Sequence, residues 1–297
     1  GRHGTSRGTM PILDAFSTVS ISMHADLHCH STASDGTLGP EALIARARQA
    51  GVTLLSVTDH DTLAAYEKIA TGTHGDLTLV PGVEFSTTWH DTGIHVVGLN
   101  TAPASEPMQA AVSAQQAARA ERAATISKRL AANGLPDLLE AARAEAGEGT
   151  VGRPHFARAM VAAGLARSEQ AAFRRYLGRG RVGDVRECFA SLEQVIAWIR
   201  QAGGVAVLAH PAHYRLSRRR RQRLISDFSA AGGGAVEVIS GRQDPALTAQ
   251  LGRDVTAHGL AASLGSDFHG PGPGVVDLGG AGTLPPGCVP VWERFDH

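Results

Sequence analysis

Short apolar runs alternate with amphipathic segments along most of the chain. Runs rich in aliphatic and β-branched residues predict strands, and apolar residues at helical spacing predict helices between them. The strands are expected at 25–28, 52–58, 77–80, 205–209, 235–239 and 261–264, and the helices at 40–50, 63–70, 192–202, 218–231 and 245–258. Segments 83–88 and 94–99 flank Asp91-Thr92-Gly93, which is typical of a β-hairpin turn. This alternation predicts an α/β fold with a parallel sheet or barrel.

One segment, 103–184, breaks the alternation. It is rich in Ala, Arg and Gln, and it predicts helices at 105–133, 136–146 and 154–163 with almost no strand. The first of these helices is expected to end at Asn133-Gly134. We therefore expect an α/β domain at 25–102 and 185–297 that is interrupted by a helical insertion at 103–184.

Residues 1–24 precede the first predicted strand. Residues 1–22 are rich in Gly, Ser and Thr, and they lack the basic and then apolar order of a signal peptide. We expect a disordered leader or a remnant of cloning here, and Met23 is then a candidate for the natural start.

Composition narrows the class of protein. The chain has 297 residues, of which 43% are hydrophobic, so it can bury a large core as one barrel or as two domains. The formal net charge is +0, which gives no overall attraction to nucleic acid or membrane. Three widely spaced cysteines indicate reduced thiols in a cytoplasmic protein, and no apolar run is long enough to span a membrane.

Residues with metal-binding chemistry begin at the first predicted strand. His28 and His30 are two residues apart, so on a strand both imidazoles face one side and Cys29 faces the other. Similar residues recur in Ser34-Asp35-Gly36, Thr58-Asp59-His60-Asp61, Gly82-Val83-Glu84, His95, Ala209-His210-Pro211 and Ser266-Asp267-Phe268-His269. Imidazole and carboxylate ligands of this kind suit zinc, manganese or iron.

Most of these segments come directly after a predicted strand. In α/β barrels, functional residues gather at the carboxyl ends of the strands, so residues far apart in the sequence are expected to meet in one site. Any single histidine, such as His74 or His258, is better explained as an ordinary surface or core residue. The whole set is better explained as one metal site, because Asp and His recur at the same end of successive strands.

These segments also resemble the motifs of a known family. Together with Pro81-Gly82-Val83-Glu84, His95-Val96-Val97-Gly98 and Gly152-Arg153-Pro154-His155, they are similar to the motifs of the PHP (polymerase and histidinol phosphatase) domain family. The resemblance extends over roughly residues 25–293, including the helical insertion. It is strongest to the branch of stand-alone nucleoside bisphosphate phosphatases and 5′-to-3′ exoribonucleases.

The resemblance implies a distorted (β/α)7 TIM-like barrel that holds three divalent metal ions, most often manganese and in some members zinc or iron. The implied ligands are His28, His30, Asp35, His60, Glu84, His95, His210, Asp267 and His269. The first ion is assigned to His28, His30, Glu84 and Asp267, the second to Glu84, His95 and His210, and the third to Asp35, His60 and His269. Glu84 bridges two ions because a carboxylate has two oxygens. Glu84, His210 and Asp267 are the residues expected to be catalytic.

The implied activity is hydrolysis of a nucleotide phosphate by metal-bound hydroxide, above all of the 3′-phosphate of nucleoside 3′,5′-bisphosphates. The alternatives are a 5′-to-3′ exoribonuclease on short 5′-phosphorylated RNA, a histidinol phosphatase and a polymerase-associated accessory domain. The expected partner is a nucleotide or short oligonucleotide, with no stable binding of duplex nucleic acid. The sequence does not define the oligomeric state. Asp59 and Asp61 are interpreted as residues that orient ligand histidines, with helix capping by Asp61 as an equal alternative.

Binding of a substrate phosphate requires cations near the metals. Arg153 and His155 are the first candidates, from the Gly-Arg-Pro-His motif, and Arg179 between two glycines is the next. Arg119 and Arg122 on the long predicted helix are weaker candidates, because most arginines on an Ala-rich helix are solvated. The run Arg218 to Arg221 is interpreted as a solvated helix start in preference to a patch that follows RNA.

Overall fold

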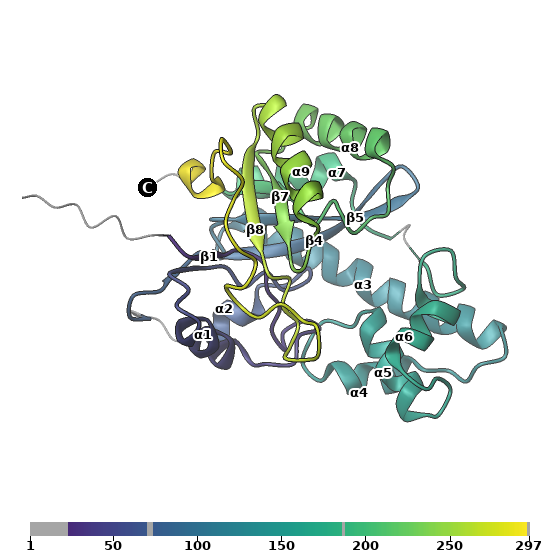
Figure 1. Cartoon of the computed structure of the whole chain (residues 1–297). Helices are drawn as coiled ribbons and strands as arrows, with labels where there is room; N and C mark the ends of the chain where they lie inside the picture. The colour runs from purple at the N-terminus through teal and green to yellow at the C-terminus, as the bar shows by residue number, and fades with distance from the viewer. Residues whose placement is uncertain (1–22, 70–73, 186–187, 296–297) are drawn as a thin grey trace, which may run out of the picture.

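A computed structural model describes residues 23–69, 74–185 and 188–295 (Figure 1). The predicted leader therefore lies almost wholly outside the described residues. Within these ranges, no helix combines the length and the apolar character needed to cross a membrane.

The strands form two sheets. The first contains three parallel strands in the order β1 (Ala25–Asp26), β2 (Leu54–Leu55) and β3 (Thr78–Leu79). The second contains β4 (Gly82–Trp89), β5 (Thr92–Leu99), β6 (Val205–Leu208), β7 (Ala235–Ser240) and β8 (Ala261–Gly265) in that order. β5 is antiparallel to both β4 and β6, whereas β6, β7 and β8 are parallel. The predicted hairpin is confirmed, and the first three strands are shorter than expected.

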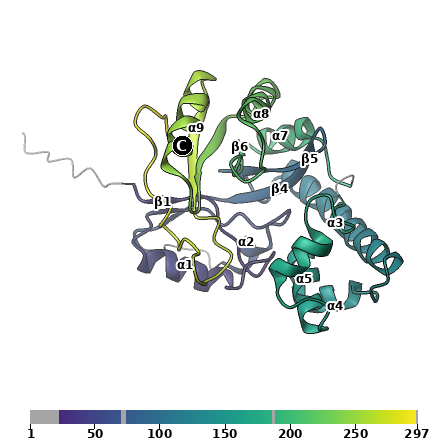
Figure 2. The ribbon, with the colours of Figure 1, turned by 45° about the vertical axis from the view of Figure 1, so that its right-hand side comes forward.

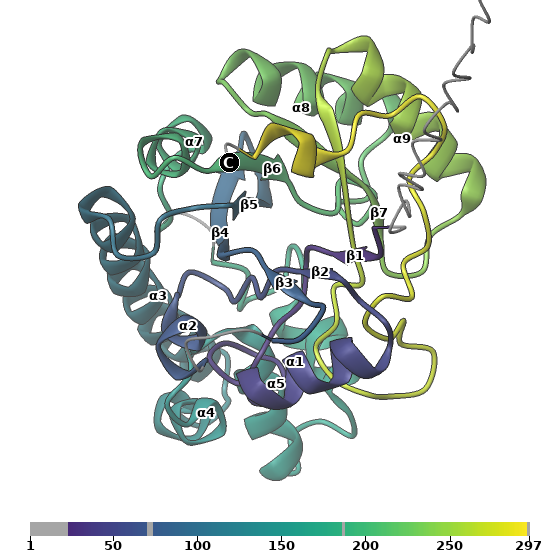
Figure 3. The same ribbon diagram turned by 90° about the vertical axis from the view of Figure 1, so that its left-hand side faces the viewer.

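Backbone hydrogen bonds join the two sheets at two places. The N–H of Leu27 donates to the carbonyl of Leu264 (3.1 Å), which joins the chain after β1 to β8. The N–H of Asp61 donates to the carbonyl of Glu84 (2.9 Å), which joins the chain after β2 to β4. Figure 3 shows the strands around a common centre with helices outside. The described strands do not close into one hydrogen-bonded cylinder, so the fold is a mixed α/β fold and the expected (β/α)7 TIM-like barrel is not confirmed.

Helices cover the outer faces of the sheets. They are α1 (Pro40–Gln49), α2 (Ala64–Lys68), α7 (Leu192–Gln201), α8 (Arg218–Ala230) and α9 (Pro245–Ala257), with a short 3-10 turn at Val291–Arg294. In α7, Leu192, Val195, Ile196 and Ile199 repeat at helical spacing and are buried in the same apolar cluster as Phe85 of β4. Ser191 begins this helix by accepting the N–H of Gln194.

Residues between β5 and α7 form a separate group of helices, α3 (Glu106–Ala132), α4 (Leu139–Ala146), α5 (Arg153–Ala162), α6 (Glu169–Ala172) and a π-helical turn at Phe173–Leu177. Figure 2 shows α3, α4 and α5 together beside the α/β part, with α3 next to β4. This group has its own apolar cluster, which includes Ile126, Leu130, Phe156 and Met160. The helices expected in 103–184 are therefore present.

The N-terminus of α5 is capped by the side chain of His155, the third residue of the helix. The Nδ1 atom of His155 accepts the backbone N–H of Gly152 (2.9 Å), three residues earlier, and the ring is buried. A side chain at this position that reaches back to the first N–H is the arrangement of a capping box. Burial, and then the nearby Arg158, lower the pKa of His155 to about 4. The ring therefore stays neutral in the fold, where Nδ1 must accept a hydrogen bond.

We expect His155→Gln to keep this helix start, because glutamine can accept the same N–H, and to remove the sensitivity to acid. A histidine in the unfolded chain has a pKa of about 6.5. The contribution of His155 to stability is therefore fully present above that pH and is lost as the pH falls toward 4. When the pH falls from 7 to 5, the free energy of unfolding measured in urea should decrease by about 1–2 kcal/mol more for the wild type than for the variant. An equal loss in both proteins would contradict this role for His155.

Candidate metal centre

The nine residues expected to bind metal lie together. His28, His30 and Asp35 follow β1, His60 follows β2, His210 follows β6, and Asp267 and His269 follow β8. Glu84 and His95 lie on the neighbouring strands β4 and β5. Each ligand-type residue stands at or just beyond a strand, so backbone pairing between strands fixes the distances between side chains. The sequence-based prediction that these segments meet is confirmed.

Glu84 lies at the centre of the group and is completely buried. Its Oε1 lies 2.7 Å from Nδ1 of His95 and 2.9 Å from Nε2 of His210. Its Oε2 lies 3.3 Å from Nε2 of His28, 3.3 Å from Nε2 of His30 and 3.0 Å from Nδ1 of His60. One carboxylate thus faces five imidazoles, with different imidazoles at its two oxygens.

Donor atoms from the nine residues form four overlapping groups. The groups are His30, Asp35, His60 and His269; His28, His30 and Asp267; His28, Glu84 and His210; and His60, Glu84 and His95. A neutral imidazole binds a metal through one nitrogen, so each shared histidine can serve one ion at a time. Two of the ligand sets implied by the resemblance nearly match these groups: the first group has His30 in addition, and the second group lacks Glu84. The remaining implied set, Glu84 with both His95 and His210, is divided, because Glu84 groups with His210 in one case and with His95 in the other.

The spacing of these atoms fits metal ions. Two atoms that each bind one ion at about 2.1 Å lie roughly 3–3.5 Å apart. Nε2 of His30 lies 3.4 Å from Asp267 Oδ1, and Nε2 of His269 lies 3.4 Å from Asp35 Oδ1. Oε2 of Glu84 is buried beside three imidazoles and yet makes no hydrogen bond within the described residues. A divalent ion is the partner that this donor set fits.

The electrostatics of the cluster favour ionised carboxylates. Burial would raise the pKa of Glu84, but the imidazoles, first of all His60 and His95, hold it well below its usual range. Asp267 behaves in the same way beside His28 and His30. Burial lowers the pKa of His60 to about 4, so this ring is neutral and offers a lone pair. Burial would lower the pKa values of His28, His30 and His210, but neighbouring carboxylates raise them above the ordinary value. The cluster therefore couples anionic carboxylates to imidazoles inside the fold.

Glu237 is a residue of the site that the sequence interpretation missed. Its Oε1 accepts a hydrogen bond from Nδ1 of His28 (2.5 Å), and its Oε2 accepts the backbone N–H of His210 (2.7 Å). The first bond directs Nε2 of His28 toward the cluster, and the second fixes the loop after β6. A signal was present, because Glu237 is a single charged residue inside the buried strand β7.

Asp59 and Asp61 do not make the contacts that were predicted for them. Asp59 accepts hydrogen bonds from the backbone and hydroxyl of Ser31 and from the hydroxyl of Ser34, and so it holds the chain between His30 and Asp35. Asp61 accepts from Ser86 N, Gln115 Nε2 and Arg119 Nε. Neither bonds directly to a ligand histidine, and the first N–H groups of α2 receive no bond from Asp61. Both residues support loops of the site instead.

The backbone near the ligand-type residues has rare conformations and close contacts between segments. Asp61, His210 and Asp267 have positive φ angles of 53°, 28° and 53°, a region that side chains other than glycine rarely adopt. A Cβ on Gly36 would lie 2.2 Å from the carbonyl oxygen of His30, and one on Gly265 would lie 2.3 Å from Cβ of His28. These two glycines allow the segments that carry Asp35 and Asp267 to approach the segment of the first two histidines.

Cys29 faces away from the cluster, as the alternation predicted. Its side chain is fully buried among apolar residues that include Leu43, Val57 and Phe268, and its Sγ–H donates to the carbonyl of Ser56 (3.3 Å). Burial raises the pKa of the thiol well above its usual range. Cys29 therefore belongs to the core.

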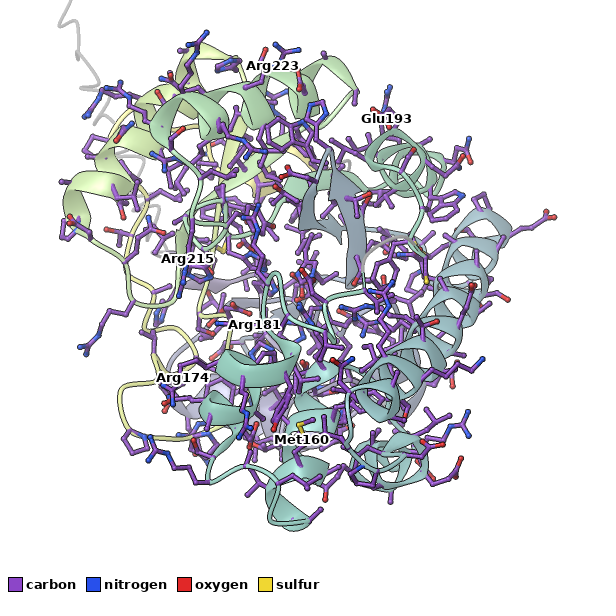
Figure 4. All side chains as sticks on the ribbon, turned by 90° about the vertical axis from the view of Figure 1, so that its right-hand side faces the viewer. Met160, Arg174, Arg181, Glu193, Arg215 and Arg223 are labelled. Carbon is purple, nitrogen blue, oxygen red and sulfur yellow. The ribbon has the colours of Figure 1, made fainter. Side chains whose placement is uncertain are left out.

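A cavity of about 1080 Å³ opens beside the cluster. Asp35, His60 and His95 form part of its wall, so the candidate metal centre can be reached from it. The same cavity is lined by seven arginines, which are Arg119, Arg122, Arg153, Arg174, Arg179, Arg181 and Arg215. Figure 4 shows Arg174, Arg181 and Arg215 on one face of the molecule. This charge is suited to an anionic ligand that also reaches the cluster.

Two of the three predicted substrate contacts line this cavity. Arg153 donates to the carbonyl of Leu177 (3.2 Å), and Arg179 donates to the carbonyl of Tyr214 (3.3 Å). His155 does not line it, because its ring is 1% exposed and caps α5. Phosphate binding by Arg153 and Arg179 stays a prediction, and we assign His155 a role in the fold.

The arginines judged weaker from the sequence are the more deeply placed. Arg119 and Arg122 are 6% and 8% exposed, so the interpretation as solvated residues is wrong. Gln115, Arg119 and Arg122 repeat at intervals of four and three, which puts them on one face of α3 and was a usable signal. His213, three residues after His210, also lines the cavity and lies 4.0 Å from Asp267 Oδ2.

The run at the start of α8 is not uniformly solvated. Arg220 pairs with Asp91 (2.7 Å) and lies over the ring of Trp89, and Arg221 is buried. Arg218 and Arg219 are exposed, as expected of a helix start. Arg220, although exposed, therefore joins α8 to the β4–β5 hairpin.

Comparison with known proteins gives consistent results. Residues 26–144 match the PHP domain model. The chain is 43% identical to the 5′-3′ exoribonuclease Rnm of Escherichia coli, over 92% of this chain and 94% of that protein. It is 39% identical to the 3′,5′-nucleoside bisphosphate phosphatase of Chromobacterium violaceum, over 91% of this chain and 96% of that protein.

A solved structure extends the comparison to the fold. The structure of an amidohydrolase from Chromobacterium violaceum, which contains sulfate and no metal, has a TM-score of 0.83 to this chain. It is 38% identical and covers 92% of this chain and 95% of its own. Sequence identity over almost the full length, together with the shared fold and the cluster of ligand-type residues, places this chain in the PHP domain family.

Proposed function

We propose that this protein is a metal-dependent phosphoesterase that removes the 3′-phosphate of nucleoside 3′,5′-bisphosphates. The observation that carries the proposal is a cluster of nine ligand-type residues that opens on an arginine-lined cavity. The first feature suits activation of water and the second suits a substrate with more than one phosphate. The names of the relatives support the same class of substrate.

We further propose that the cluster holds three divalent ions, with manganese as the expected metal. His28, His30, Asp35, His60, Glu84, His95, His210, Asp267 and His269 would hold them, as the donor groups allow. Such ions supply Lewis-acid chemistry, because they lower the pKa of a water molecule and neutralise phosphoryl oxygens. Glu84 would be shared between ions, since its two oxygens face different histidines.

The chain itself contributes orientation and charge. Glu237 keeps a proton on Nδ1 of His28, which leaves Nε2 free to act as a ligand. Arg153 and Arg179 would hold the phosphate that is not cleaved, and a guanidinium can donate two parallel hydrogen bonds to it. No serine or cysteine nucleophile is required, and Cys29 is buried away from the cavity.

A second candidate is a 5′-to-3′ exoribonuclease that acts on short 5′-phosphorylated RNA. The observation that favours it is the size of the cavity, because about 1080 Å³ exceeds the usual range of roughly 300–1,000 Å³ for small-ligand pockets. Arginines from the insertion and from the loop after β6 line it, so an oligonucleotide would meet cations along its length. Turnover of adenosine 3′,5′-bisphosphate against a 5′-phosphorylated tetranucleotide would rank the two.

We expect more than one equivalent of transition metal in protein purified without a chelator. The reason is that nine donor residues form four overlapping groups, whereas a mononuclear site needs only three or four ligands. Elemental analysis by mass spectrometry, paired with activity on the same sample, checks this. Full activity with one tightly bound ion per chain would show that the three-ion centre is wrong.

Glu84→Ala and Asp267→Ala should abolish turnover, while Cys29→Ser should leave it nearly intact. The two carboxylates face the imidazoles of the cluster, and the Cys29 thiol faces apolar residues. Turnover and metal content should be measured on all three variants, with folding checked by circular dichroism. If Cys29→Ser lost metal as completely as Glu84→Ala, the orientation of the segment after β1 would have to be revised.

Arg153→Ala should weaken recognition of a second phosphate. Losing one charge-assisted contact costs roughly 1.5–3 kcal/mol, which is about a ten- to hundredfold loss in kcat/KM for adenosine 3′,5′-bisphosphate. The loss should be small for p-nitrophenyl phosphate, which has no second phosphate. Equal losses on both compounds would mean that Arg153 serves the reacting group or the fold.

A further inference from the structure

The guanidinium of Arg122 lines the cavity and has no acidic partner among the residues that the structure describes. The side chain is 8% exposed, and its Nε donates to the carbonyl of Val185 (2.7 Å). No carboxylate of the described residues lies within ion-pair distance of it, in contrast to Arg119, which pairs with Asp61. A buried cation without an anion is costly, so this position favours an anion supplied by a ligand.

The surroundings of Arg122 add positive charge. Burial, and then Arg153 of α5 and Arg119 of α3, lower the pKa of Arg122 to about 9, while Asp61 and Asp184 act in the opposite direction. Arg122 is therefore still protonated at neutral pH. Three guanidiniums thus gather on the part of the cavity wall that α3 and α5 form. Asp61 beside Arg119 and Asp184 at 3.7 Å from Arg153 offset part of their mutual repulsion. A bound oxyanion beside Arg122 would offset the rest.

An aromatic ring holds two of these groups in place. The guanidinium carbons of Arg122 and Arg119 lie 5.2 Å and 5.8 Å from the ring centre of Phe189. Stacking on an aromatic ring fixes the plane of a guanidinium, and Nε of Arg122 is fixed by Val185. The terminal nitrogens of Arg122 make no hydrogen bond within the described residues, so they are the atoms left for a ligand.

We propose that Arg122, together with Arg119 and Arg153, forms a phosphate-binding subsite in the wall of the cavity. Arg119 also donates to the hydroxyl of Ser86 (3.0 Å), and Ser86 pairs with His95 across the β4–β5 hairpin. This end of the subsite therefore adjoins the metal cluster. Arg122 lies three residues further along α3, about 4.5 Å of helix rise. The subsite thus suits a second phosphate of the same nucleotide.

The identity of the ligand rests on the proposed function, but the test needs no turnover. Adenosine 5′-monophosphate and adenosine, which differ only in one phosphate, serve as probes for calorimetric titration of the protein as purified. Arg122→Met should weaken binding of the monophosphate about ten- to hundredfold and leave binding of adenosine unchanged. Lys128→Met is the matched control, because it removes one positive charge from an exposed position of the same helix.

Arg122→Lys separates the loss of an anion contact from damage to the fold. It keeps the charge and loses the planar fork, so it should melt near the wild-type temperature and lose less affinity than the methionine variant. Monophosphate affinity that is unchanged in both Arg122 variants, or reduced as much by Lys128→Met, would overturn the subsite. Failure of the proposed function has a different signature, because the wild type would then bind the monophosphate and hydrolyse no bisphosphate.

Discussion

Burial of the Glu84 carboxylate among five imidazoles is the constraint on which the site depends. An ionised group in the interior of a protein is tolerated only with partners of opposite charge or with bound metal. Its partners come from the segments after β1, β2 and β6 and from β5. The strands must therefore end at one level, and the connections that follow them must turn inward. β1 and β2 are short, because the chain leaves the sheet before the segments that carry His28, His30 and His60.

The helical insertion adds positively charged side chains beside the carboxylates of this site. The α/β part supplies carboxylates and imidazoles, which suit cations, whereas α3, α5 and the loop near Arg179 supply guanidiniums, which suit anions. A phosphate ester with its metals satisfies both at once. The ion pair of Arg119 with Asp61 joins the two parts at the wall of the cavity. In the proposed function, recognition of the substrate and support of the site would therefore share residues.

Much of this arrangement could be predicted from the sequence. The helices and strands lie close to the expected ranges, since the apolar periodicity of segments such as 192–202 is strong. The ligand-type residues meet because they follow successive strands. Closure of the sheet could not be predicted, because it depends on the register between sheets and not on local pattern. Glu237 was missed and Arg122 was ranked as a weaker candidate for a related reason: each acts from the middle of an element, where the role of a polar residue depends on its neighbours in space.

The two glycines beside the ligands have a consequence for how such a site is recognised. Gly36 and Gly265 carry no donor atom, yet a single methyl group at either position would overlap the chain that bears His28 and His30. A search for ligand-type side chains would identify neither glycine. Contact between backbone segments sets the distances of His28 and His30 from Asp35 and Asp267. The dimensions of the candidate metal centre are therefore determined partly by glycines, whose side chains cannot bind a metal.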